Sequence, residues 1–108
     1  MGMRGEKNTS VSEQASSTLV KRLAKLGDVS AKKMFGGHGI FHEGKMFGIV
    51  DSKGNPFLKV DDSTKAEYDQ LDAEKHGKMP YYAIPAPVLN DDAMLIEWAE
   101  KAISVSKK

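Results

Sequence analysis

Two tight-turn signals that lie close together constrain the fold of this chain more than any other feature. Glu43-Gly44 and Lys53-Gly54-Asn55 divide the stretch from Met34 to Asp62 into three short segments rich in Ile, Phe, Val and Met. Glycine readily adopts the positive φ of tight turns, and β-branched and aromatic residues suit a half-buried pleated surface. The stretch therefore predicts an antiparallel meander with strands over 38–42, 45–51 and 56–60, preceded by a short strand over 29–35.

A first helix is expected before this meander. Ser10-Val11-Ser12-Glu13 has the sequence of a capping box, and apolar residues follow it at three- and four-residue spacing. Gly27 suits the position that ends many helices, so this helix should run from Ser10 to about Leu26. Residues 1–9 are polar and aperiodic and are expected to form a flexible tail.

Two further helices are expected after the meander. Asp61 can cap a middle helix that begins near Ser63 and ends before Gly77. Asn90-Asp91-Asp92 supplies capping oxygens for a C-terminal helix whose apolar stripe includes Trp98. We expect this last helix to bury its stripe, so that a Trp98→Ala change is severely destabilising.

The length of the chain limits it to one domain. Its 108 residues, 40% of them hydrophobic, can bury one modest core, and two domains would each lack the apolar surface to offset chain entropy. We therefore expect a two-layer α+β fold, in which an antiparallel β-sheet with meander order is packed by N-terminal, middle and C-terminal helices, in a single domain over residues 10–106.

Charge and composition exclude several functional classes. The formal net charge of +1 is far from the concentrated positive field of proteins that hold nucleic acid through phosphates, which disfavours direct nucleic-acid binding. With no cysteine, the chain has no disulfide or thiol chemistry. No apolar run approaches the ~20 residues of a membrane-spanning helix, and no signal peptide is evident. A cytoplasmic protein with no membrane partner is expected.

No catalytic, cofactor or metal site is predicted. The sequence lacks GxSxG and HExxH patterns. The glycines of Gly36-Gly37-His38-Gly39 lead into a strand, whereas a phosphate-binding loop leads into a helix. His38 and His42 would share one face of a strand but lie ~13 Å apart, too far for one metal ion. We therefore expect no enzymatic activity.

Two pairs of adjacent residues resemble parts of an interaction surface. Lys32-Lys33 stands beside Met34-Phe35, and Tyr81-Tyr82 lies in a proline-bracketed segment, 79–85, that suits an edge strand. Neighbouring strand residues point to opposite faces, so each pair should offer one outward member and one core member. The candidate partner-binding residues are Lys32, Lys33, His38, Tyr81 and Tyr82.

Four segments in series carry a resemblance to a known family. The resemblance lies in KKMFGGHGIFHEGKMFGIV, then FLKVDD, MPYYAIP and the terminal WAEKA helix. Over roughly residues 10 to 106 the chain resembles the TfoX/Sxy N-terminal domain family. The resemblance implies an antiparallel sheet covered by helices on one face. It also implies kinship with bacterial regulators of natural competence, which act with the cyclic-AMP receptor protein to activate transcription. It brings no catalytic residue, cofactor or ligand.

The chain departs from the family pattern in two places. The full-length regulators carry a second, helical domain, whereas this chain stops at Lys108. Many relatives have another strand between the middle helix and the MPYY segment, where this chain has only Asp72 to Lys78. The sheet is therefore expected to expose an edge, which favours a homodimer or strand addition by another chain.

Three functions stay open at this point. The leading hypothesis is a non-enzymatic regulatory or adaptor domain that acts through protein contacts, with the transcription machinery as a candidate partner. The alternative is a module that binds a small molecule or peptide at the sheet edge or its concave face, with Tyr81 or Tyr82 at the rim. The third is direct DNA binding, which would need a local basic face formed by Lys21, Lys25, Lys32 and Lys33.

Overall fold

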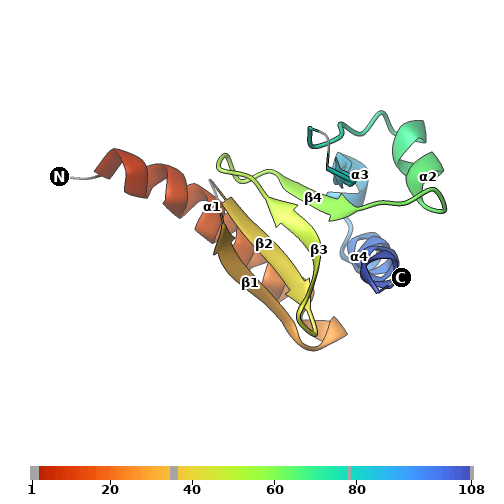
Figure 1. The fold of residues 1–108 in the computed structure, drawn as a ribbon, viewed down its shortest axis with the longest axis horizontal. Helices are drawn as coiled ribbons and strands as arrows, with labels where there is room; N and C mark the ends of the chain where they lie inside the picture. The colour runs from red at the N-terminus through yellow and green to blue at the C-terminus, as the bar shows by residue number, and fades with distance from the viewer. Residues whose placement is uncertain (1–2, 35–36, 78, 108) are drawn as a thin grey trace.

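The structure is a computed structural model that describes residues 3–34, 37–77 and 79–107, with side chains from residue 11 onward. Phe35 and Gly36, which the sequence analysis placed at the end of the first strand and in the glycine motif, lie outside the described residues. The elements in chain order (Figure 1) are α1 (Met3–Arg22), the 3₁₀ helix η1 (Ala24–Leu26), β1 (Val29–Met34), β2 (Gly37–His42), β3 (Lys45–Val50), β4 (Pro56–Lys59), α2 (Lys65–Gln70), β5 (Tyr81–Ala83), α3 (Ala86–Leu89) and α4 (Asp92–Ser106).

The sheet confirms the predicted meander. Its strand order is β1-β2-β3-β4-β5, and every neighbouring pair is antiparallel. In the β2–β3 turn, Glu43 and Gly44 both have positive φ, 51° and 83°, as a type I′ hairpin turn requires. The register of β2 on β3 shifts after Ile40, where β3 contains a bulge at Phe47.

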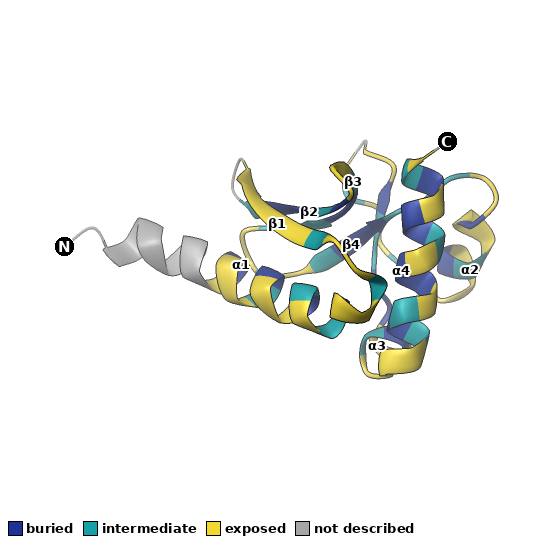
Figure 2. Cartoon of the chain, turned by 90° about the horizontal axis from the view of Figure 1, so that it is seen from below, coloured by how far each residue is buried: buried dark blue, intermediate teal, exposed yellow. Residues whose placement is uncertain are grey.

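The helices form a second layer on one face of the sheet, which confirms the two-layer α+β fold. Figure 2 shows α1 below β1 and β2 and α4 upright at the right, where it contacts β3 and β4. Trp98 of α4 is buried, as predicted, and its ring meets Tyr68 of α2 edge-on with 4.7 Å between centroids. The core between the layers includes Leu19, Leu23, Ile40, Phe47, Val50, Leu58, Val88, Leu95, Ala99 and Ala102.

The helix boundaries differ from the sequence-based expectation at several points. The backbone is already helical at Met3, so Ser10 lies within α1 and the predicted capping box does not mark its start. At the other end α1 stops at Arg22, and η1 follows before Gly27, which has the expected positive φ of 75°. The middle helix α2 is shorter than predicted, Lys65–Gln70.

The C-terminal helix begins where the sequence predicts it. Asp91 is its N-cap, and Oδ1 of this side chain accepts a hydrogen bond from the Met94 amide at 3.1 Å. The short helix α3 before it was not predicted. Pro87 fits in its first turn because amides there need no intrahelical partner. Among the described residues, no helix has the length and apolar character needed to cross a membrane.

Candidate functional site

The two faces of the sheet differ in whether helices cover them. Residues opposite one another on neighbouring strands share a face, and the register places Lys32, Gly39, Ile49, Phe57 and Ala83 in one row across all five strands. The adjacent row is Ala31, Ile40, Gly48, Leu58 and Tyr82. Ile40 and Leu58 are fully buried in the core beneath the helices. The first row therefore lies on the opposite face, which no described helix covers over β1, β2 and β3 (Figure 2).

This open face carries a cluster of apolar side chains. We call Met34, Phe41, Met46 and Ile49 the Met–Phe patch. Three of its members converge on Gly39, because a Cβ added there would lie 2.6 Å from Met34 Sδ, 2.8 Å from Met46 Sδ and 2.9 Å from a Phe41 ring carbon. Met34 is 43% exposed. The unbranched thioether side chains of methionine adapt easily to different apolar partners.

The other end of the same face is covered by the segment that leads into β5. The His76 ring packs on Phe57 with 4.6 Å between centroids, and Phe57 is buried. Between this segment and the Met–Phe patch lies a hollow of ≈ 410 Å³, and its lining includes Met34, Ile49, His76 and Met79. The open face is thus an apolar surface with a depression at one side.

The two candidate lysines lie on opposite faces, as their adjacency predicts, but both are exposed, so the expectation that one of them is a core residue is wrong. Lys32 is at the rim of the Met–Phe patch, where its Nζ stands 5.8 Å from the centroid of the Phe41 ring, a cation–π contact. Lys33 lines a different hollow of ≈ 630 Å³, between α1 and β1 on the helix side. The structure therefore does not bring Lys32 and Lys33 into one binding site.

His38 lies between β2 and α1, on the helix side of the sheet, and faces away from the Met–Phe patch. Its Nδ1 is 2.8 Å from Ser12 Oγ, and the two groups are hydrogen-bonded. His38 is 8% exposed and Ser12 only 1%, so a substrate cannot reach this hydroxyl. The pair joins α1 to β2 and offers little area to a partner.

Tyr81 and Tyr82 also lie on opposite faces of the sheet. Tyr81 is 3% exposed, burial raises the pKa of its hydroxyl, and this hydroxyl donates to the Met46 carbonyl at 3.4 Å. Tyr82 is half-buried, and its ring lies 5.7 Å from the Tyr68 ring. Tyr82 faces the helices and Tyr81 faces the opposite side of the sheet, but Tyr81 is buried there, so neither tyrosine is the exposed member that was expected.

The outer edge of β5 is not free. The Lys75 backbone forms a bridge with Tyr82, the His76 amide donates to the Tyr81 carbonyl, and the Ala83 amide donates to the Glu74 carbonyl, both at 2.8 Å. The predicted exposed edge is therefore not the one beside the MPYY segment. It is β1, at the other side of the sheet, where every residue after Val29 is exposed.

The titratable side chains that the structure describes form no centre that could hold a metal ion. In the described part of the chain, no three His, Asp or Glu residues come close enough to share one. His42 Nδ1 is buried without a hydrogen-bond partner, 4.0 Å from Glu43 Oε1. The same carboxylate accepts a hydrogen bond from Lys107 Nζ at 2.9 Å, which lowers the pKa of Glu43.

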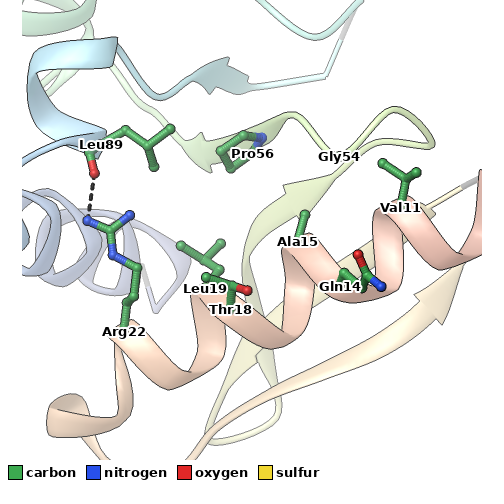
Figure 3. A pocket seen from close by; sticks show the side chains of 9 residues that line it. All are labelled: Val11, Gln14, Ala15, Thr18, Leu19, Arg22, Gly54, Pro56 and Leu89. Carbon is green, nitrogen blue, oxygen red and sulfur yellow. Dashed lines mark hydrogen bonds between the residues drawn. The ribbon is translucent and has the colours of Figure 1, made fainter.

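A further groove runs along α1 on the side away from β1 (Figure 3). It has a volume of ≈ 370 Å³ and is lined by Val11, Gln14, Ala15, Thr18, Leu19, Arg22, Gly54, Pro56 and Leu89. Arg22 stands at one end, but its guanidinium already donates to the Leu89 carbonyl at 2.6 Å and to Asp92 at 2.7 Å. The groove is therefore mainly apolar, with a neutralised charge at its end.

Comparison with known proteins agrees with the resemblance drawn from the sequence. The pattern that describes the TfoX N-terminal domain matches residues 21–106, which is most of the chain. The comparison with curated proteins gives no match. On the family match, the chain belongs to the TfoX N-terminal domain family.

Proposed function

We propose that this chain is a TfoX-like regulatory domain that acts by binding another protein, without catalysis, and that the Met–Phe patch is the binding surface. One observation carries the proposal: four apolar side chains stand together on a sheet face that the described helices leave uncovered. Apolar patches of this kind commonly mark interaction sites. The family match supports a regulatory role, and the resemblance to competence regulators makes the bacterial transcription machinery, in the cytoplasm, the first partner to test.

The chemistry of the patch indicates the kind of partner. Met34 and Met46 provide deformable apolar area, Phe41 provides a flat ring, and Lys32 adds one positive charge at the rim. A partner segment with a few apolar side chains beside an acidic residue complements this surface.

The test is affinity capture from the native cell lysate with a matched pair of variants. Met34→Glu places a charge in the patch, and Leu71→Glu places the same charge on a side chain that is equally exposed, 43%, but lies outside the patch. The proposal expects one set of proteins, with RNA polymerase or a transcription factor among them, to be captured by the parent and by Leu71→Glu and to be lost with Met34→Glu. Equal capture by all three forms would refute the patch as the binding surface.

A second function is favoured by the groove in Figure 3, which falls in the size range of ligand pockets. There a small apolar molecule or peptide would lie between Val11 and Pro56. Its signature is a rise in melting temperature on adding the ligand, abolished by Ala15→Trp, which fills the groove.

Direct DNA binding has less support, because Lys32 lies on the opposite sheet face from Lys33, which shares its hollow with the acidic Glu13.

A further inference from the structure

The free edge of β1 offers unpaired backbone groups in a defined pattern. The Glu43 amide donates to the Asp28 carbonyl, so the carbonyl of Asp28 points toward β2. Both backbone groups of alternate residues in an antiparallel strand point to the same side. Ser30 and Lys32 therefore bond to β2, while the amides and carbonyls of Val29, Ala31 and Lys33 point away from the sheet. In the described part of the chain no strand pairs with them.

The flank of α1 beside this edge carries one acidic and one basic side chain. The hollow between α1 and β1 is lined by Glu13, Ser16, Ser17, Val20, Lys21, Ala31, Lys33 and His38. Ser17 and Ala31, two small exposed residues, lie in this hollow together. Glu13 precedes Ser17 by one helical turn and Lys21 follows it by one turn, so opposite charges are placed symmetrically about Ser17.

We propose that a second copy of this chain covers the edge, with β1 of each copy paired antiparallel around a two-fold axis at Ala31. The sheet then runs continuously through both copies. This register opposes Val29 to Lys33 and Ser30 to Lys32, so no two lysines face each other.

The neighbouring registers are less favourable. An axis at Lys32 would oppose the two Lys32 side chains directly. An axis at Ser30 would require Asp28 to continue the strand, and its φ of 52° departs from the extended conformation. Edge lysines normally discourage strand pairing, and they do so here in the register centred on Lys32.

The same two-fold axis brings the two α1 helices together. Because α1 contacts β1, β2 and β3 on one face of the sheet, the axis places the two α1 helices side by side on the same face of the joined sheet. The proposal sets the hollow that Ser17 and Ala31 line at the axis, so that Glu13 of each copy faces Lys21 of the other.

The first test is the mass in solution, by light scattering over a range of concentrations. The proposal expects twice 11.8 kDa for the parent chain. Ala31→Pro removes an amide that points away from the sheet, so it should give a monomer in which the bonds between β1 and β2 remain. A parent that stays monomeric at the highest concentration, or a dimer that Ala31→Pro leaves intact, would overturn the proposal. Circular dichroism checks the fold of each variant.

The second test reads the register and does not depend on a proline. Glu13→Lys or Lys21→Glu alone should weaken dimerisation at least tenfold, because each opposes like charges at two places in the dimer. The double variant Glu13→Lys/Lys21→Glu should restore the parent affinity. Failure of the double variant to restore it would overturn this axis. The inference does not rest on the proposed function. The capture experiment tests the Met–Phe patch on the open face of the sheet, whereas the dimer uses the β1 edge and the flank of α1 on the other face.

The chain contains no cysteine, which allows a direct measurement of proximity. Ala31→Cys should form a disulfide-linked dimer under mild oxidation, because opposed residues of an antiparallel pair have Cα atoms about 5.5 Å apart, within disulfide range. Glu100→Cys, exposed on α4, is the matched control and should remain monomeric. Equal cross-linking of the two variants would contradict the proposed axis.

Discussion

Two glycines of β2, Gly37 and Gly39, provide a sharp test of how tightly the sheet is packed. A Cβ at Gly37 would overlap the Val50 carbonyl oxygen and lie 3.1 Å from Asp51 Cα, so its neighbours are backbone atoms. The three atoms nearest to a Cβ at Gly39 would be the sulfurs of two methionines and a carbon of a phenylalanine ring, which are the ends of side chains. Alanine should therefore be costly at Gly37 and tolerated at Gly39.

The magnitudes follow from these contacts. At Gly37 the strands must separate by about 1 Å to restore van der Waals contact, and overpacking of this kind costs about 1–3 kcal/mol. Replacing glycine by alanine also reduces the entropy of the unfolded chain, which returns about 0.4–1 kcal/mol. We expect Gly37→Ala to lower the free energy of unfolding by about 1–2 kcal/mol. At Gly39 the exposed Met34 side chain can swing outward, so the two effects nearly cancel.

The assay is urea unfolding followed by the fluorescence of Trp98, the only tryptophan in the chain and a buried one. With a slope of about 1–3 kcal/mol per molar urea, the midpoint of Gly37→Ala should fall by about 1 M while that of Gly39→Ala stays near the parent value. All three proteins are compared at the same low concentration so that association contributes equally. A Gly37→Ala midpoint equal to or above that of Gly39→Ala would refute the reasoning.

Three further changes test the core and the titratable groups. Trp98→Ala should cost about 3–5 kcal/mol, because the ring is buried against Tyr68, and a urea midpoint equal to the parent's by circular dichroism would contradict it. Burial raises the pKa of Tyr68 and Tyr81 above the ordinary value of 10.0. The stability that these protonated hydroxyls contribute is therefore present below pH 10.0 and is lost as the pH rises above it. Tyr68→Phe should flatten this alkaline decline in melting temperature. Lys107 lowers the pKa of Glu43 below its ordinary value of 4.5. The stability from this ion pair is therefore present above pH 4.5 and is lost as the pH falls below it. Glu43→Gln should make the melting temperature fall less steeply in acid.

Local signals were enough to predict the sheet order and the last helix. The turns at Gly44 and Gly54 and the cap at Asp91 are read from a few adjacent residues, and the structure confirms each of them. Alternation along a strand also placed Lys32 and Lys33 on opposite faces correctly. Predictions of this kind succeed because the interactions that decide them lie within a few residues along the chain.

Features that depend on distant segments were not predictable in this way. The segment Glu74–His76 pairs with β5 and covers Phe57, so the tyrosines that looked like an interface are largely enclosed. His38 is buried under α1 and hydrogen-bonded to Ser12, 26 residues away along the chain. The Met–Phe patch was also missed, because Met46 and Ile49 are three positions apart in β3 and share a face only through the bulge at Phe47. Choosing which strand face is open requires knowing where the helices pack.

The neighbour-to-neighbour order of the strands has a consequence for the rate at which this domain folds. Each hairpin closes a short loop, which costs little chain entropy, and chains rich in such local pairings fold fast for their size. The contact between Arg22 and Asp92, 70 residues apart, closes a far longer loop by bringing α1 to α4. We expect the central hairpins to form in the transition state and the two helices to dock after it. Substitutions at Ile40 should then slow folding, while substitutions at Leu95 should mainly speed unfolding.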